Sequence, residues 1–423
     1  MKNPHFLLLL LSFLFLACSG DDDAPADGKP DIEEMPDTDP EVIATEGFTP
    51  CEDGMAGIYP CNGYDFLGRI PLNDFGGNSG NDIWGWTDAT TGKEYALMGL
   101  DNGTAFIDIS DTENLLYLGK LPTAGVSDAW RDVKVYKDHA FIVADNSFDD
   151  DAHGMQVFDL TRLRNVADAP VTFDADARYT GLGRAHNIVI NEDTGFAYVV
   201  GTNRGDVYRG GAHFIDINDP KNPMSAGGYA DNGYSHDAQV ITYNGPDADY
   251  AGREIYIGAN ESQVIVADVT DKANPIGIST VQYPNTSYTH QGWFTEDQRY
   301  FILGDETDEI NFGFQSRTLV FDLSDLDNPE LHYTYLGPTS AIDHNGYVKG
   351  DEYFLANYTA GLRVLDISNI AGRSITESGF FDTYTDSNNP RFDGVWSVYP
   401  YFESGKIIVS DINSGLFVIQ KSQ

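Results

Sequence analysis

The sequence has little positive charge and little that would form helices. Only 25 Lys and Arg stand against 66 Asp and Glu, which gives a net charge of −41. Such a chain would repel the phosphates of nucleic acid, so nucleic acid is excluded as a partner. Long Ala, Leu, Lys and Glu runs are scarce, whereas 43 Gly, 24 Tyr and 24 Phe favour many short strands joined by tight turns.

Cysteine is also scarce, since the chain has three. Two of them, Cys51 and Cys61, are close in sequence. In an oxidising compartment such a pair predicts a disulfide that closes a small loop. A metal site would need further ligands nearby, and none follow.

The N-terminus has the features of an export signal. Lys2 precedes an apolar run over residues 6–17, which has the length of a signal-peptide core and is too short to span a bilayer. The run ends in Leu16-Ala17-Cys18-Ser19, which resembles a bacterial lipobox. That resemblance implies that Cys18 becomes the lipidated first residue of the mature protein; the alternative is an ordinary cleaved signal.

The segment after Cys18 is acidic. Residues 20–23, Gly-Asp-Asp-Asp, resemble the surface-export signal of Bacteroidetes lipoproteins. The chain stays acidic and Pro-rich to residue 46, with too little apolar area to offset the entropy of ordering. We therefore expect a signal peptide over 1–17, a disordered tether over 18–46 and one folded domain over 47–423.

That domain contains seven copies of one unit of strands and turns. The copies recur about every 50 residues, as in repeat folds. They begin at Trp84, Trp130, His186, His236, His290, His344 and Trp396. The seventh copy has no room for a fourth strand, but residues 66–71 echo the fourth strand of the first copy at 117–122. The sequence therefore predicts an all-β, seven-bladed β-propeller in which an N-terminal strand completes the last blade.

The third strand of six copies ends in Asp. These residues are Asp108, Asp159, Asp216, Asp268, Asp322 and Asp366. Each is followed by residues typical of Asx or Ser/Thr turns, so we expect the side chains to accept hydrogen bonds from turn amides. The recurring acids then belong to the scaffold.

The repeat carries a family resemblance. The strand end Val/Ile-x-Asp-Ile/Leu-Ser/Thr resembles the LVIVD repeat. Longer segments resemble the choice-of-anchor B family, namely 80–87, 185–189, 235–239, 289–293 and 343–345. This resemblance spans residue 47 to the C-terminus and implies a secreted bacterial propeller attached to cells. It supplies no activity and no catalytic residues.

The residues that begin the seven copies are the main candidate site. In a propeller the innermost strands start beside the axial channel, so four His and Trp84, Trp130 and Trp396 predict a mouth with an imidazole arc and an aromatic arc. Converging nitrogens would hold a divalent transition metal, and the Trp faces would stack on an anionic or sugar ligand. Alternatively, the rings pack between blades, and the polar residues that follow them face the channel.

Two acidic loops are a second candidate. Residues 145–151 include Asp145, Asp149 and Asp151, and residues 305–309 are Asp-Glu-Thr-Asp-Glu. Several hard oxygen ligands within a few residues suit calcium. Neither loop has EF-hand spacing, and the alternative is a solvated loop.

These features favour a binding protein over an enzyme. The sequence has no Gly-x-Ser-x-Gly elbow, phosphate-binding loop or His-Glu-x-x-His motif, and no catalytic residue is identified. We expect an outer-membrane lipoprotein, exposed on the cell surface, that binds a protein or glycan ligand. The alternatives are a metal-dependent hydrolase or lyase using the four His, and a structural envelope component.

Overall fold

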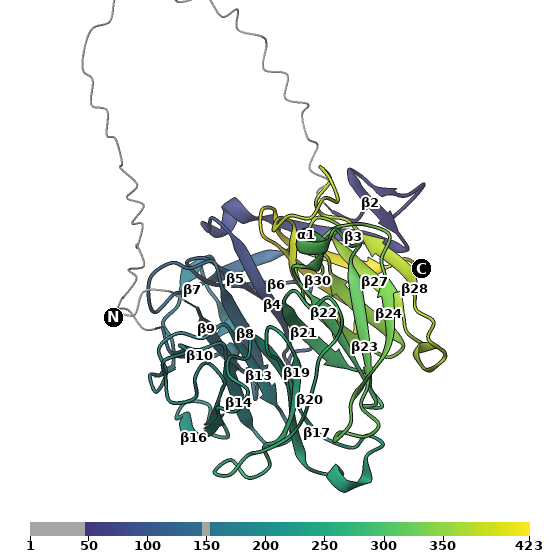
Figure 1. The fold of residues 1–423 in the computed structure, drawn as a ribbon. Coiled ribbons are helices and arrows are strands. Elements are labelled where there is room, and N and C mark those ends of the chain that lie inside the picture. Colours follow the sequence, from purple (N-terminus) through teal and green to yellow (C-terminus); the bar gives the residue numbers. More distant parts are fainter. Residues whose placement is uncertain (1–46, 146–152) are drawn as a thin grey trace, which may run out of the picture. The chain divides into compact units, whose positions relative to one another are not determined.

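The computed structural model describes residues 47–145 and 153–423 (Figure 1). The predicted signal peptide, lipidated Cys18 and tether, together with Asp149 and Asp151, lie outside the described residues. In the described ranges, no helix is both long and apolar enough to cross a membrane.

The fold is a seven-bladed β-propeller, as the repeats predicted. Each blade is an antiparallel sheet whose first strand is innermost. The first four blades contain, in order, β4 (Gly80–Thr87), β5 (Glu94–Leu100), β6 (Gly103–Asp108) and β7 (Leu116–Pro122); β8 (Arg131–Tyr136), β9 (His139–Ala144), β10 (Met155–Asp159) and β12 (Ala177–Tyr179); β13 (Asn187–Asn191), β14 (Phe196–Val200), β15 (Ala212–Asp216) and β16 (Met224–Tyr229); and β17 (Asp237–Thr242), β18 (Glu254–Ala259), β19 (Val264–Asp268) and β20 (Ile276–Val281).

The last three blades follow the same plan. They contain, in order, β21 (Thr289–Phe294), β22 (Tyr300–Asp305), β23 (Arg317–Asp322) and β24 (Glu330–Leu336); β25 (Gly346–Lys349), β26 (Glu352–Ala356), β27 (Leu362–Asp366) and β28 (Thr376–Phe381); and β29 (Val395–Tyr399), β30 (Lys406–Asp411), β31 (Gly415–Lys421) and β3 (Tyr64–Pro71). Short additions are β11 (Val171–Thr172) beside β7, β1 (Met55–Ala56) and β2 (Tyr59–Asn62) beside β28, α1 (Asp308–Phe312), and the 3-10 turns Leu72–Phe75, Leu160–Asn165, Ala248–Tyr250 and Ile370–Gly372.

The N-terminal strand closes the ring. β3 pairs antiparallel with β31, with Phe66 opposite Ile419 and Ile70 opposite Leu416. In Figure 1 this purple strand lies beside the yellow C-terminal strands. The closure predicted from residues 66–71 is confirmed, and it leaves no free edge on β31 where another chain could pair.

The core lies between neighbouring blades. The second strand of a blade is buried on both faces, as in β5 and β22, because a blade stands on either side of it. Between blades five and six, for example, Ile302 and Val320 pack with Val348 and Leu355. Apolar and aromatic residues therefore run continuously along these strands.

The Asp residues at the ends of the third strands cap turns. Asp108 Oδ1 accepts a hydrogen bond of 3.0 Å from the backbone N–H of Ser110. The other five residues accept equivalent hydrogen bonds from the amide two positions later, and they are Asp159, Asp216, Asp268, Asp322 and Asp366. Their predicted scaffold role is confirmed.

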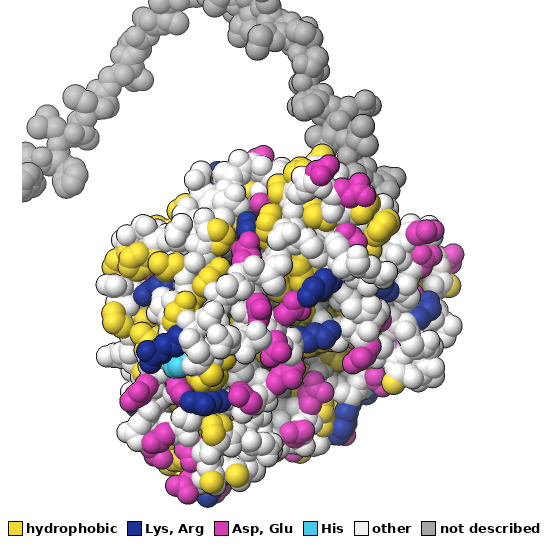
Figure 2. Space-filling model, turned by 90° about the vertical axis from the view of Figure 1, so that its right-hand side faces the viewer, with side chains coloured by type: hydrophobic (Ala, Val, Ile, Leu, Met, Phe, Trp, Pro, Cys, Tyr) yellow, Lys and Arg dark blue, Asp and Glu magenta, His cyan; other side chains and the backbone are white. Residues whose placement is uncertain are grey.

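A disulfide joins Cys51 to Cys61, as predicted, and fixes the loop that leads into β3. On the face drawn in Figure 2, Asp and Glu side chains are spread among Lys and Arg and form no single large patch.

Candidate functional site: the histidine end of the channel

The innermost strands stand side by side around the channel. Each contacts the next in chain order, and β29 contacts β4, which completes the circle. All seven run in the same direction, so their first residues gather at one end of the channel. The sequence placed the His and Trp residues at these starts.

Four imidazoles form an arc at this end. Ring centroids lie 4.2 Å apart for His186 and His236, 4.3 Å for His236 and His290, and 4.4 Å for His290 and His344. Trp396 continues the arc 4.8 Å from His344. At the other end of the arc, the Trp130 ring lies 6.2 Å from that of His186.

Two of these rings, those of His290 and Trp396, lie on bulges at the starts of their strands. In β21, Thr289 pairs with Asp305 and Gln291 with Gly304, so His290 between them is an extra, bulged residue. Trp396 is bulged in the same way between Val395 and Ser397 of β29. A bulge re-aims its side chain, which is why such irregularities recur beside binding sites.

The Nδ1 atoms of three histidines are held by acceptors. The Nδ1 of His236 lies 3.1 Å from the backbone oxygen of His290, and that of His344 lies 2.5 Å from the backbone oxygen of Trp396. The Nδ1 of His186 lies 3.0 Å from a carboxylate oxygen of Asp145. With Nδ1–H donating, Nε2 remains a lone-pair donor toward the channel. Both sequence alternatives thus hold in part, because the rings link adjacent blades and also line the mouth.

Glu306 faces two of these rings. Its carboxylate oxygens lie 3.6 Å from Nε2 of His290 and 3.6 Å from Nε2 of His344. The hydroxyl of Tyr358 donates to it at 2.9 Å. Burial raises the pKa of Glu306 to about 7 and lowers that of His344 to about 3, so the His344 imidazole is neutral at neutral pH.

Sequence reasoning placed Glu306 in an acidic loop and missed its contact with the histidines. A signal was present, because in an antiparallel hairpin the end of the second strand meets the start of the first. Thr289 opposite Asp305 is that pairing, and it brings Glu306 to the mouth.

Aromatic side chains complete the mouth, a cavity of about 300 Å³. Besides the arc, its lining includes Tyr234, Tyr288 and Thr307. Trp130 is 42 % exposed. The cavity thus combines flat apolar walls with imidazole and carboxylate groups, which suits a ligand with an apolar face and hydroxyl or anionic substituents.

Trp84 lies outside this mouth, contrary to the predicted arc of three Trp. Its ring stacks edge-on with Tyr399 at 5.1 Å, and the ammonium of Lys134 lies 4.6 Å from its centre. With Trp293 it lines a separate cavity of about 350 Å³ at the other end of the inner strands. The reason is register: β4 begins at Gly80, so Trp84 lies halfway along the strand.

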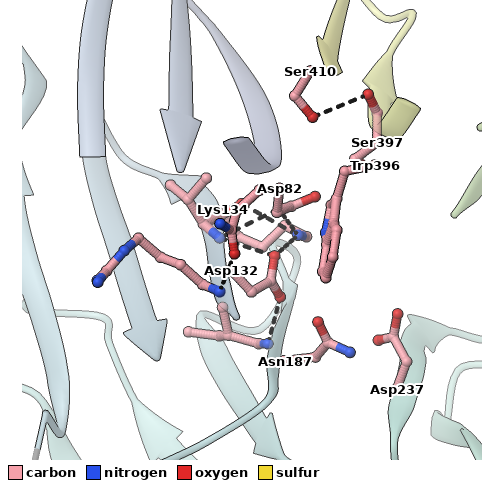
Figure 3. Close-up of polar contacts among 12 residues, drawn as sticks. Asp82, Asp132, Lys134, Asn187, Asp237, Trp396, Ser397 and Ser410 are labelled. Carbon is pink, nitrogen blue, oxygen red and sulfur yellow. Dashed lines mark hydrogen bonds and ion pairs between the residues drawn. The ribbon is translucent and has the colours of Figure 1, made fainter. Parts of the chain in front are cut away.

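A buried charged cluster lies among the inner strands (Figure 3). Lys134 Nζ lies 3.0 Å from Asp82 and 2.5 Å from Asp132. Against burial, which alone would lower it, the two carboxylates raise the pKa of Lys134 well above its usual range. Asn187 and Asp237, which follow His186 and His236, lie near this cluster in Figure 3. Asn187 donates to the backbone oxygen of His236 at 2.9 Å, and burial raises the pKa of Asp237 to about 7.

The acidic residues of the two loops, 145–151 and 305–309, have different surroundings. Asp145 holds His186, while the rest of its loop lies outside the described residues. Asp305 is structural, because the amides of Ser287 and Tyr288 donate to it at 2.8 and 2.6 Å. Asp308 and Glu309, further along, are buried, so the solvated-loop alternative is wrong for them.

Comparison with known proteins supports the fold. No family model matches the chain, and no curated protein matches it. Solved structures do match. A protein from Lactobacillus plantarum is 13% identical with a TM-score of 0.51, over 78% of this chain and 88% of that one. A putative 6-phosphogluconolactonase from Bacteroides uniformis is 13% identical with a TM-score of 0.50, over 72% and 85%. The β-propeller domain of Cps50 (Swd1) from Myceliophteria thermophila is 9% identical with a TM-score of 0.49, over 78% and 94%. At such identities a likeness shows the fold alone, and the two matches with TM-scores of 0.50 and 0.51 share the overall fold of this chain.

Proposed function

We propose that this chain is a binding module of the choice-of-anchor B type, held at the outer membrane by lipid on Cys18 and exposed on the cell surface. The lipobox-like residues 16–19 and the acidic segment that follows support the anchor. Acyl chains bury methylene groups in the bilayer, and several of them give durable attachment. The tether over 18–46 then separates the propeller from the membrane.

The ligand of this module is a protein or a glycan, captured at the histidine end of the channel. The observation that carries this proposal is the open cavity in which Trp130 and Trp396 stand at the two ends of the imidazole arc. Indole faces stack on sugar rings or on apolar side chains. Imidazole nitrogens and Glu306 exchange hydrogen bonds with hydroxyl or amide groups.

Glycan and protein arrays probed with residues 47–423 test this proposal. We expect saturable binding that becomes at least about 10-fold weaker when Trp130 and Trp396 are both changed to Ala, because central aromatic residues dominate binding energy. Trp84→Ala is the matched control, since Trp84 is a half-buried channel Trp in the other cavity. Unchanged capture by the double variant, or equal loss in the control, would contradict the proposal.

A metal-dependent hydrolase or lyase is the second candidate, and one observation favours it. The two distances of 3.6 Å from Glu306 to His290 and His344 are close to the ligand–ligand distance of about 3.4 Å in a tetrahedral zinc site with ligands near 2.1 Å. The Nδ1–H of His344 donates to a carbonyl, as the second nitrogen of a metal-bound histidine usually does.

Zinc titration by calorimetry, with elemental analysis, tests this second candidate. We expect one equivalent of Zn²⁺ to bind, at least about 10-fold more weakly to Glu306→Gln. His332→Gln is the control, because His332 bonds to the backbone of Ile370 away from the mouth. If no stoichiometric zinc binds, the metal-dependent enzyme is ruled out and the binding module remains.

A further inference from the structure

Three carboxylates meet at the junction of blades five and six, apart from the histidine arc. Asp308 and Glu309 begin α1, and Asp343 immediately precedes His344. These three side chains belong to residues that are 0 %, 3 % and 1 % exposed, respectively. One oxygen from each lies within 4.8 Å of the others.

Most of the oxygens in this cluster have no partner. Asp308 Oδ1, Glu309 Oε2 and both side-chain oxygens of Asp343 are buried without a hydrogen bond. Among the described residues, the one ion pair made by the cluster joins Arg317 Nε to Asp308 Oδ2 at 2.5 Å. Neighbouring Asp305 differs, because a tyrosine hydroxyl and two backbone amides donate to it.

The backbone leaves room for these oxygens. A Cβ on Gly304 would lie 2.2 Å from Oδ2 of Asp343, so a side chain there would displace the carboxylate. The amide of Asp343 donates to Oε1 of Glu309 at 3.4 Å, but the remaining buried oxygens are costly and the cluster must take up protons or a cation. Burial, followed by repulsion from Asp308, raises the pKa of Glu309 to about 9. The cluster is therefore neutralised by protons or by a cation, and the spacing of its oxygens allows the cation.

Oxygen ligands of a calcium ion lie about 2.3–2.6 Å from the metal, and therefore up to about 5 Å from one another. One oxygen each from Asp308, Glu309 and Asp343 lies within 4.8 Å of the other two, so all three can bind one such ion. An all-carboxylate set favours a hard cation over a transition metal. We propose that these three residues bind a divalent cation of the calcium class that cross-links blades five and six.

The proposed cation also stabilises the positions of Glu306 and His344 in the histidine mouth. Asp308 lies two residues after Glu306, and Asp343 is the residue before His344. Binding the two carboxylates to one ion therefore holds both chain segments that bring Glu306 and His344 together. This role is independent of what the mouth itself binds.

Calcium titration of the purified full chain, after chelator treatment, tests the site. We expect one equivalent of Ca²⁺ to bind and Tm to rise by about 3 °C at one hundred times the Kd. Asp343→Asn and Glu309→Gln should each lose the binding and the rise. Asp327→Asn is the control, because it belongs to an acidic group with Asp247 and Asp325 that is partly exposed to solvent. Asp327→Asn should keep both the calcium binding and the rise in Tm.

Other results would overturn the site. If calcium and chelator leave the wild-type Tm unchanged while Asp343→Asn is equally or more stable, protons neutralise the cluster. An equal rise with calcium in Asp343→Asn would show a non-specific salt effect. If Asp343→Asn fails to fold, the calcium response of Glu309→Gln and the difference in wild-type Tm between calcium and chelator still show whether the cluster binds calcium. His290→Ala should retain the calcium response, which separates this site from the mouth.

Discussion

Replacing Phe66 by Ala should destabilise the whole propeller, because Phe66 anchors the closing strand β3. The ring is fully buried, with centroids 5.6 Å from Tyr59, 6.2 Å from Phe381 and 6.3 Å from Phe417. Phe381 belongs to blade six, and Phe417 to the last blade. The ring therefore packs the closing strand against its own blade and against blade six.

The expected cost follows from these contacts. Truncating a buried Phe to Ala removes the burial of the ring and leaves a cavity, which costs about 3–5 kcal/mol. Each lost aromatic pair contributes about 0.5–1.5 kcal/mol of specific attraction, and Phe66 makes three. We therefore expect a loss of about 4–5 kcal/mol in the free energy of unfolding, because rings from three different strands surround Phe66 and limit collapse into the cavity.

Urea unfolding followed by tryptophan fluorescence measures this loss as a change in the free energy of unfolding. Phe48→Ala is the matched control, since Phe48 is 61 % exposed and should change stability by less than about 0.5 kcal/mol. A cost below about 1 kcal/mol for Phe66→Ala would refute the reasoning, because a closing strand cannot be dispensable in a ring of blades.

Two further predictions concern buried charge. Lys134→Met should cost about 3–5 kcal/mol in urea unfolding, because it leaves Asp82 and Asp132 buried without their cation. Lys93→Met, which removes an ion pair whose lysine side chain is 48% exposed, should cost less than about 1 kcal/mol, and equal costs would contradict the argument. Burial lowers the pKa of His153 in the folded chain to about 3. As pH falls below about 6.5, the unfolded chain binds a proton that the folded chain does not bind, so the free energy of unfolding decreases as the pH is lowered. His153→Gln should therefore lose about 3 kcal/mol less than wild type between pH 7 and pH 4, and parallel pH profiles would disprove this.

The fold could be predicted because its signals are local and repeated. Each short apolar strand ends in a turn residue such as Asp322, and the seven copies fix the number of blades. The closing strand was visible because residues 66–71 resemble a fourth strand that otherwise has no place. The histidine arc followed from the topology, since strand starts in a propeller share one end of the channel.

The site could be predicted only in part, because its remaining features depend on register and burial. Aligning the copies placed Trp84 with the histidines, yet β4 starts four residues earlier and carries Trp84 toward the other cavity. The acidic loop at 305–309 has the composition of a solvated turn. Its burial depends on distant residues such as Asp343, whose backbone N–H donates to Glu309, and no local pattern reveals that contact. The contact of Glu306 with His344 is likewise between residues far apart in the sequence.

Blocking one end of the channel at a time shows which end captures the ligand. Thr307 lines the histidine mouth, and Asn244 lines the cavity at the other end. Each is changed to Cys and labelled with a bulky maleimide, and capture of the ligand found on the arrays is measured. We expect the label at Thr307 to abolish capture and the label at Asn244 to leave it unchanged. Capture that survives at Thr307, or is lost only at Asn244, would contradict this expectation.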